Sequence, residues 1–311
     1  MDEEAMGRFH TLPGSELKED ILRHIQKKRD GYYFMNRPDG SCVMLDPDGL
    51  CRIQRNSSEE MLCITCRKFP RLAGRVQEDY WMSMAASCPV TAGYLWTKSV
   101  GWYMTDGKAT DNVNWRQLPY PKDKAEGLEK VFGALQKCSG DLQYTEEQQV
   151  GILWERYQCM YHLMDGCLEI LSSSPELHYL EGSFDYFEKD YGAAEIISHM
   201  MAFQEEYGEK LQRFTGNYIL YRVYSRCLEF SDESGEDSLF LTLGELFLFY
   251  LLRFGRYQTM QKNDHASIVA EINWMYRFCA HSKKRSAHFL SLLRDIFKNL
   301  EYLAEIIIKI S

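Results

Sequence analysis

The sequence predicts a mainly α-helical protein in which a small, irregular, cysteine-rich N-terminal domain packs on an α-helical C-terminal domain. Five of the ten cysteines fall within 47 residues, between Cys42 and Cys88. Turn sequences interrupt that region, whereas apolar residues repeat at three- and four-residue steps through much of the later chain. We expect a cysteine-rich cluster-binding domain over residues 1–105, a linker over 106–124 and an α-helical domain over 125–311.

Composition and charge narrow the function classes. The 311 residues suffice for one large or two ordinary domains, and 45% hydrophobic with 26% charged residues is usual for globular proteins. A formal net charge of −9 argues against a nucleic-acid-binding surface, which concentrates lysine and arginine. The first twenty residues are acidic and polar, with no basic segment followed by an apolar run. We therefore expect no signal peptide and a cytoplasmic location.

The longest apolar run, LFLTLGELFLFYLLRF over residues 239–254, raises the question of a membrane span. Glu245 and Arg253 interrupt it, and it is shorter than the roughly 20 residues that cross a bilayer as a helix. The run is therefore interpreted as a buried core helix, and we expect no membrane partner.

Two turn sequences mark the N-terminal region. Arg37-Pro38-Asp39-Gly40 and Asp46-Pro47-Asp48-Gly49 each combine a proline, which presets φ, with a glycine that tolerates positive φ. Each turn ends two residues before a cysteine, Cys42 or Cys51. Tight turns beside ligands suit a small metal-binding domain, although a pair of surface hairpin loops would show the same turn sequences.

The helical half begins after the polar, proline-bearing segment over 106–124. Thr145 and Gln148 form a capping-box pattern at the head of a helix that we expect to reach about Leu171. Further helices are predicted over 192–229, 239–261, 265–281 and 286–309, with an acidic loop over 231–238. One apolar face runs through the last helix, formed by Phe289, Leu292, Leu293, Ile296, Phe297, Leu300, Leu303 and Ile307.

The crowded cysteines predict a metal or metal–sulfur site, because disulfide staples need an oxidising compartment and are typical of small secreted domains. Cys63 and Cys66 form a CxxC pair, which alone is compatible with zinc, a redox dithiol or a cluster. Pro70 disfavours the long helix that follows a thioredoxin-like dithiol. The CxxxCxxC spacing of radical enzymes is absent, since position 59 is Glu59.

Three motifs in a fixed order carry a specific resemblance: Cys42 followed by Gly49-Leu50-Cys51-Arg-Ile, then Cys66-Arg-Lys-Phe-Pro-Arg71, then Ser87-Cys88-Pro89. This order resembles the flagellin lysine-N-methylase (FliB-type) family. A weaker match, Arg277-Phe-Cys-Ala-His281-Ser, extends the resemblance to residues 40–285, with high specificity over 42–89. The family usually begins with a C-x-x-x-C-C element followed by Gly-Trp. The first 41 residues here contain no cysteine, so the chain resembles an N-terminally short member.

The resemblance implies a cytosolic methyltransferase that transfers methyl groups from S-adenosylmethionine to surface lysines of flagellin and binds a four-iron four-sulfur cluster. By the motif match, Cys42, Cys51, Cys66 and Cys88 are the expected metal ligands, and four thiolates are the usual complement of such a cluster. Cys63 lies outside the family pattern. A structural zinc ion on the same four thiolates is the alternative.

Basic residues follow the CxxC pair. Arg67 and Arg71, with Lys68 and Arg75 nearby, would stabilise the negative charge of a thiolate cluster and could hold the carboxylate of a bound cofactor. The alternative is a solvated loop of mixed charge.

Methyl transfer needs a sulfonium held in line with a neutral lysine amine, and aromatic rings attract a sulfonium through cation–π interaction. Two sets of aromatic residues at helical spacing are candidates for binding the sulfonium, although most such sets belong to the packed core. They comprise Trp154, Tyr157 and Tyr161, and Tyr218, Tyr221 and Tyr224. His281 and His288 are candidate bases. No GxGxxG run is found, so the sequence does not indicate where the methyl donor binds.

Two other functions fit the same sequence. The chain could be a non-catalytic protein-binding module stabilised by an iron–sulfur cluster or zinc. It could also be a redox sensor that acts through Cys63 and Cys66, which predicts a reversible disulfide.

Overall fold

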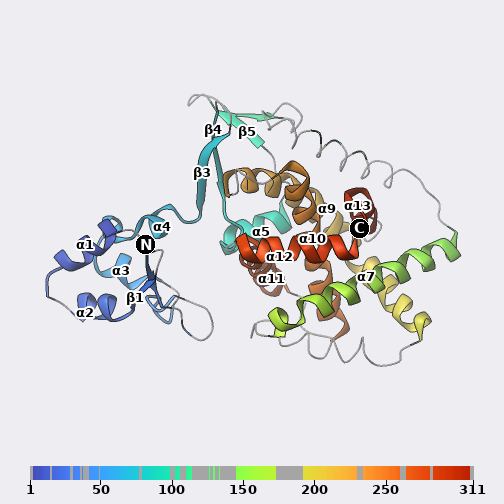
Figure 1. Cartoon of the computed structure of the whole chain (residues 1–311), viewed down its shortest axis with the longest axis horizontal. Helices are drawn as coiled ribbons and strands as arrows, with labels where there is room; N and C mark the ends of the chain where they lie inside the picture. Colours follow the sequence, from blue (N-terminus) through green and yellow to red (C-terminus); the bar gives the residue numbers. More distant parts are fainter. Residues whose placement is uncertain are drawn as a thin grey trace. The chain divides into compact units, whose positions relative to one another are not determined.

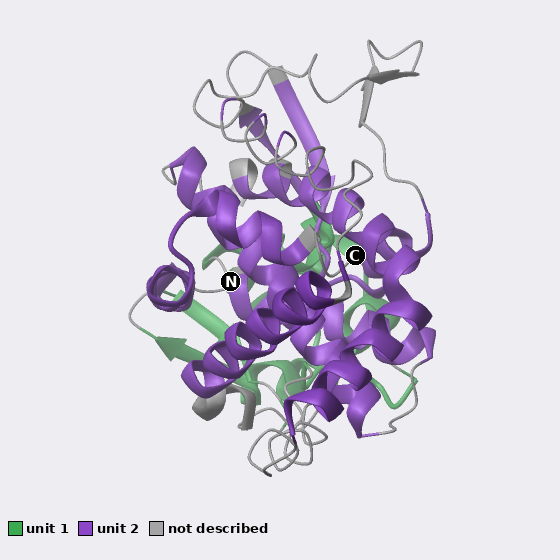
Figure 2. Ribbon diagram, turned by 90° about the vertical axis from the view of Figure 1, so that its right-hand side faces the viewer, with its two compact units in different colours: residues 1–71 green, residues 72–311 purple. Residues whose placement is uncertain are grey.

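A computed structural model describes residues 3–14, 16–28, 31–35, 37, 42–48, 50–76, 79–98, 102–105, 110–113, 126, 129, 133, 145–172, 192–229, 234–259, 264–280 and 283–308. The chain is mainly α-helical with a small N-terminal region of short strands, as the sequence predicted (Figure 1). It divides into two compact units, residues 1–71 (unit 1) and 72–311 (unit 2), shown in Figure 2. The division falls inside the predicted 1–105 domain, and most of the predicted 106–124 linker lies outside the described residues.

Unit 1 begins with two helices, α1 (Glu3–Thr11) and α2 (Glu16–Arg23). An antiparallel hairpin follows, in which β1 (Ile25–Lys28) pairs with β2 (Gly31–Phe34). Gly31 closes this hairpin with φ 139°, a conformation that side-chain-bearing residues rarely adopt.

The rest of unit 1 consists of three short helical pieces: α3 (Arg52–Asn56), the 3₁₀ helix η1 (Glu59–Met61) and α4 (Ile64–Lys68). α4 ends two residues before Pro70, consistent with the restriction that proline places on the residue before it. The described core of unit 1 is small and consists of Ala5, Phe9, Ile21, Met44, Ile53, Leu62 and Cys63.

The strands around the start of unit 2 form two separate hairpins. β3 (Arg71–Val76) pairs with β4 (Asp79–Met84), and Leu72 and Trp81 of this pair pack against the core of unit 2. Between the hairpins lies α5 (Pro89–Thr97). The second hairpin is antiparallel and pairs β5 (Trp102–Thr105) with β6 (Thr110–Val113).

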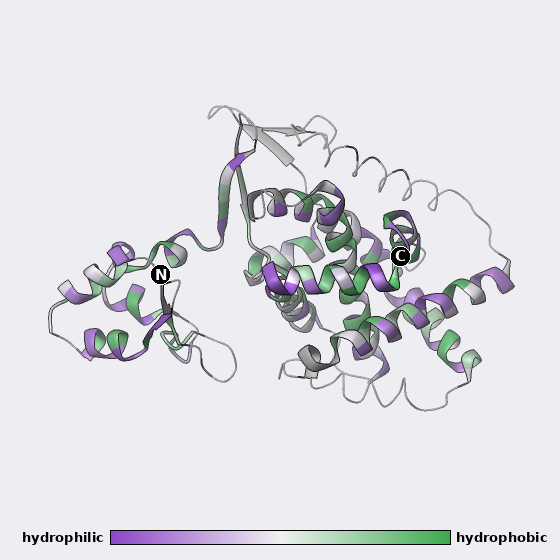
Figure 3. Ribbon diagram, viewed as in Figure 1, coloured by the Kyte–Doolittle hydropathy of each residue, from purple (hydrophilic) through white to green (hydrophobic). Residues whose placement is uncertain are grey.

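Long helices form the body of unit 2. α7 (Glu146–Ser172) begins with the predicted capping box: the Gln148 backbone N–H donates to the Thr145 hydroxyl at 3.3 Å, and the Thr145 N–H donates to the Gln148 side chain at 3.0 Å. α9 (Ala193–Glu229) and α11 (His265–Ala280) match the predicted spans within one residue. Hydrophobic and hydrophilic residues alternate along α7 and α12, as expected for helices packed on one side (Figure 3).

Two sequence predictions in this half were wrong. The predicted acidic loop over 231–238 already contains the start of α10 (Gly235–Gln258), because the Ser234 hydroxyl accepts from the Asp237 N–H at 3.1 Å and caps the helix. The predicted single helix over 286–309 is two helices, α12 (Lys283–Ile296) and α13 (Leu300–Ile308). Asn299 begins the second one, since its side chain accepts from the Tyr302 N–H at 2.8 Å.

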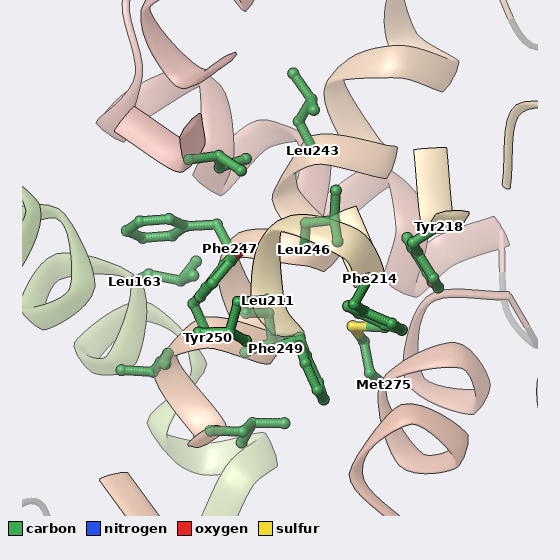
Figure 4. Packing of buried hydrophobic residues seen from close by; sticks show 14 of the residues in the cluster. Leu163, Leu211, Phe214, Tyr218, Leu243, Leu246, Phe247, Phe249, Tyr250 and Met275 are labelled. Atoms are coloured by element: carbon green, nitrogen blue, oxygen red, sulfur yellow. The ribbon is translucent and has the colours of Figure 1, made fainter. Parts of the chain in front are cut away.

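α10 is the central helix of unit 2. Its side chains pack against residues of α7, α9 and α11, among them Leu163, Phe214 and Met275 (Figure 4). The ring centroids of Phe214 and Phe249 lie 4.6 Å apart. Among the described residues, α10 is the helix long and apolar enough to cross a membrane, and its apolar window is entirely buried inside the unit.

Buried ion pairs interrupt the apolar core. The Glu245 carboxylate accepts from Arg222 Nε at 2.7 Å, from Arg226 Nη1 at 2.8 Å and from the Tyr218 hydroxyl at 2.9 Å, and all four side chains are fully buried. The Arg222 guanidinium also lies over the Tyr276 ring, 4.8 Å from its centroid. This network explains why a glutamate interrupts the apolar run of α10.

A second buried carboxylate, Glu271 of α11, binds two arginines near the end of α10. Arg253 Nη1 donates to it at 2.8 Å and Arg256 Nε at 2.6 Å. Arg253 is therefore an anchor between two core helices, which is why this arginine also interrupts the apolar run.

Candidate metal centre

A tight turn brings Cys51 back beside the segment that follows Cys42. The Asp46 N–H donates to the Leu50 carbonyl at 2.8 Å, and Cys51 forms an antiparallel bridge with Leu45. The Leu50 N–H also donates to the Asp48 carboxylate at 3.1 Å, which is the usual role of an aspartate in a turn. The turn predicted at residues 46–49 is thus present in its described residues, whereas the one predicted at 37–40 lies outside them apart from Arg37.

Arginines brace this turn. Arg52 Nη2 donates to the Val43 carbonyl at 3.0 Å, while Arg52 Nη1 forms an ion pair with Asp20 of α2 at 2.7 Å. Arg55 Nη1 pairs with Asp46 at 2.8 Å. Arg37 donates to the Leu45 carbonyl as well. The segment carrying Cys42 and Cys51 is therefore fixed by side chains from several parts of unit 1.

The CxxC pair lies at α4. Cys63 is the N-cap residue of this helix, and its carbonyl accepts from the Arg67 N–H at 3.0 Å. One helical turn places residues i and i+3 on the same side, so the sulfur atoms of Cys63 and Cys66 lie 3.4 Å apart. Cys63 is buried in the core of unit 1, whereas Cys66 is exposed.

The thiol pKa values show that these cysteines share one environment. The hydrogen bond between the two sulfurs lowers the pKa of Cys63 to about 6, and the same hydrogen bond, together with burial, raises the pKa of Cys66. The pKa of Cys42 is raised, first by burial and further by the nearby Cys51 and Cys63. Cys42 and Cys51 also raise the pKa of Cys66. Cys42 and Cys51 also pack against the small core that contains Cys63, so these three cysteines of unit 1 share one apolar environment.

A four-thiol set has the chemistry of a zinc or cluster site. No three histidine, cysteine, aspartate or glutamate side chains in the described part of the chain are arranged to hold a metal ion as they stand. However, two thiolates bound to one tetrahedral zinc ion at about 2.3 Å are about 3.8 Å apart. The Cys63–Cys66 separation of 3.4 Å is close to this value. The donors therefore fit in number and type, since Cys42 and Cys51 pack against the same small core that contains Cys63.

The sequence-predicted ligands fall into both units. Cys42, Cys51 and Cys66 belong to unit 1, whereas Cys88 belongs to unit 2 as the N-cap residue of α5. The predicted set with Cys88 stays a prediction. Cys63, which the family pattern left out, lies beside Cys66 in unit 1, and the CxxC spacing itself was the sequence signal for it.

The predicted cofactor-binding arginines lie beside the CxxC pair in the chain. Arg67 is half-buried on α4 and contributes to the lowered pKa of Glu60, after the hydrogen bond from the Ser58 hydroxyl. Arg71 is exposed and begins β3. Their role toward a cofactor stays a prediction.

The two sets of aromatic residues differ in exposure. On α7 the Trp154 and Tyr157 rings stack with centroids 5.5 Å apart, and Tyr161 is 38% exposed. Tyr218 and Tyr221 are buried in the core of unit 2, as the core-packing alternative expected. The Tyr224 side chain and His281 lie outside the described residues, and His288 is exposed on α12.

Comparison of the chain with protein-family models, with curated proteins and with solved structures finds no match.

Proposed function

We propose that the chain is a protein-lysine N-methyltransferase that uses S-adenosylmethionine to methylate surface lysines of flagellin and carries a metal–thiolate centre in unit 1. The order of the Cys42–Cys51, Cys66–Arg71 and Ser87–Pro89 motifs supports the activity and substrate. The close Cys63–Cys66 pair, together with Cys42 and Cys51 packed against the same small core, supports the centre, and it is the observation on which the proposal chiefly depends.

In this proposal the centre is held by Cys42, Cys51, Cys63 and Cys66. The resemblance implies a four-iron four-sulfur cluster, and four thiolates can ligate one. A bound centre would cross-link the turn before Cys51 to α4 and so stabilise a unit with a small apolar core. Cys88 then need not be a ligand, and Arg67 and Arg71 would offset the negative charge of the thiolates.

The methyl donor carries a sulfonium, which binds favourably against aromatic faces. Of the two sets of aromatic residues, the one on α7 suits this role better. Tyr161 is partly accessible, whereas Tyr218 is buried in the core and its hydroxyl donates a hydrogen bond to Glu245. We therefore assign Tyr161 and the half-buried Trp154 as the aromatic surface toward the methyl donor, with the buried Tyr157 stacked behind Trp154.

A second function is a non-catalytic protein-binding module stabilised by zinc. The 3.4 Å separation of the Cys63 and Cys66 sulfurs favours it, because two thiolates on a single ion lie about that close. In a four-iron cluster each cysteine binds a different iron, which holds the sulfurs farther apart.

A methyl-transfer assay distinguishes the methyltransferase from the non-catalytic module. Anaerobically purified full-length protein is incubated with tritiated S-adenosylmethionine and purified flagellin, and tritium in flagellin is counted. The methyltransferase proposal predicts incorporation that requires the metal centre, so it should be lost in Cys66→Ser and retained in Cys159→Ala, a buried cysteine of unit 2. Metal-loaded protein that transfers no methyl group would contradict the enzyme proposal and support the module.

A further inference from the structure

The amino end of α5 lacks the side-chain cap that other helices have. Cys88 occupies its N-cap position, and its side chain accepts no hydrogen bond from the first turn. Pro89 has no N–H, so the backbone N–H groups of Val90 and Thr91 remain as the donors of this end. By contrast, an aspartate or serine side chain caps α11 and α10, at 2.9 Å and 3.1 Å.

Two hydroxyl groups at the same end also lack partners. Within the described residues, the Thr91 and Ser87 hydroxyl oxygens are buried and make no hydrogen bond. Thr91 is only 6% exposed, and as the third residue of α5 its Cα–Cβ bond leans toward the amino end. Leaving a buried polar group without a hydrogen-bond partner is unfavourable, so an acceptor at this end would stabilise both hydroxyl groups.

The rest of α5 is held firmly in place. At its carboxyl end, Asn217 Nδ2 donates to the Leu95 carbonyl at 2.9 Å and Arg213 Nη2 donates to the Trp96 carbonyl at 3.2 Å. Before the helix, the Ala86 N–H donates to the Tyr221 hydroxyl at 2.8 Å. Side chains of α9 thus fix both flanks of α5.

This amino end is also reachable from solvent. Val90 is 59% exposed, Pro89 is exposed and Cys88 is partly exposed. The end of the helix is therefore exposed at Pro89 and Val90, while the Thr91 and Ser87 hydroxyl oxygens are covered, so a ligand that reaches them must displace a neighbouring side chain.

We infer that the amino end of α5 binds the carboxylate of a small ligand. Two backbone N–H groups and two hydroxyls supply four donors, which match the two oxygens of one carboxylate. The positive end of the helix dipole favours the negative charge. The carboxylate can come from a free amino acid or from the amino-acid part of S-adenosylmethionine, and the second source depends on the proposed function.

The test follows the backbone amide signals of Val90 and Thr91 in ¹⁵N-labelled full-length protein by NMR. Acetate, methionine and S-adenosylhomocysteine are titrated separately. We expect saturable shifts at both amides with acetate, and at least tenfold weaker binding in Thr91→Val and in Ser87→Ala. Thr97→Val is the matched control, because the Thr97 hydroxyl donates to the Gly93 carbonyl at the other end of α5.

The outcomes separate the site from the proposed function. No saturable shift with any carboxylate, or equal affinity in Thr91→Val, Ser87→Ala and the parent protein, would overturn the site. Tight binding of S-adenosylhomocysteine that is lost in both variants, while 5′-methylthioadenosine binds them and the parent equally, would identify the methyl donor as the source. Binding of acetate and methionine without S-adenosylhomocysteine would keep the site and contradict the methyl donor as the source of the carboxylate, whereas the methyltransferase proposal is decided by the tritium-transfer assay.

Discussion

The cores of the two units differ in size and in composition. Unit 1 buries a few side chains, and a cysteine of the CxxC pair is one of them. Unit 2 buries a long apolar helix, α10, among aromatic and aliphatic residues of its neighbours, with Glu245 and Glu271 neutralised by buried arginines. Domains near 70 residues rarely gain enough stability from apolar burial alone. If unit 1 carries the proposed thiolate centre, we expect its stability to depend on that centre, whereas unit 2 depends on packing.

The largest expected effect is that metal removal unfolds unit 1 and leaves unit 2 folded. Structural zinc contributes about 10–16 kcal/mol of apparent binding free energy, far more than the core of unit 1 can replace. We expect a chelator to abolish hydrogen-exchange protection over residues 1–71 and to leave α9 and α10 of unit 2 protected. Unchanged protection in unit 1 after complete metal loss would contradict the account.

Single cysteine variants test which thiols bind the metal. If the ligands are the four cysteines of unit 1, Cys63→Ser should lose most of its bound metal, while Cys88→Ser keeps it. Metal content per chain measures this, with Cys159→Ala as the control for a thiol of unit 2. The reverse result, with Cys88 required and Cys63 dispensable, would restore the ligand set implied by the motif match.

In unit 2 the largest effect is expected from Glu245→Gln. The substitution leaves Arg222 and Arg226 buried without their carboxylate, and breaking a buried pair typically costs about 3–5 kcal/mol. The free energy of unfolding of unit 2, from urea titration followed by helical circular dichroism, should fall by that amount. Arg294→Ala, which removes a largely exposed ion pair with Asp237, should cost at most about 1 kcal/mol.

A smaller loss of stability is expected when an added side chain disturbs the close packing of α10 against α12. A Cβ atom at Gly244 would lie 2.1 Å from Cδ1 of the fully buried Leu293, so Gly244→Ala should destabilise unit 2 by about 1–3 kcal/mol. Gly151 of α7 has no atom within 4 Å of an added Cβ. Gly151→Ala should therefore leave unit 2 unchanged or up to about 1 kcal/mol more stable. Equal losses in the two variants would argue against the packing of α10 described here.

The smallest effect concerns protons at the CxxC pair. Because the pKa of Cys63 is lowered to about 6 in the metal-free protein, this sulfur is mostly thiolate at pH 7 and thiol at pH 5. Zinc binding should then release about one more proton at pH 5 than at pH 7, and the fall in affinity per pH unit should be about tenfold steeper below pH 6 than above it, because Cys63 then joins the other thiols that must lose a proton. Calorimetry in buffers of different ionisation enthalpy measures the released protons. Equal release at both pH values would contradict the thiolate assignment.

The helices of unit 2 could be predicted because local signals set them. The capping box of Thr145 and Gln148 and the apolar period of 265–281 each correspond to an observed helix start or span. Asn299 was missed as a cap because the apolar period continues across it and masks the break. The Glu245 network could not be predicted, since its partners lie on α9, about 20 residues away, and only the fold places them together.

The local arrangement of the candidate centre could be predicted in part. Spacing identifies Cys63 and Cys66 as a pair, and turn chemistry places Cys51 next to the segment after Cys42. Which four of the five crowded cysteines bind a metal stays a prediction, because Cys88 lies in unit 2 and no local pattern decides between it and Cys63.

The most direct test of the central claim is the metal content of the protein. Iron, acid-labile sulfide and zinc are quantified together in anaerobically purified full-length protein, alongside an absorption spectrum. The account predicts a thiolate-bound centre: about four irons and four sulfides per chain for the cluster, or one zinc without sulfide for the module. Folded protein with neither metal would contradict the claim that the thiols of unit 1 hold it together.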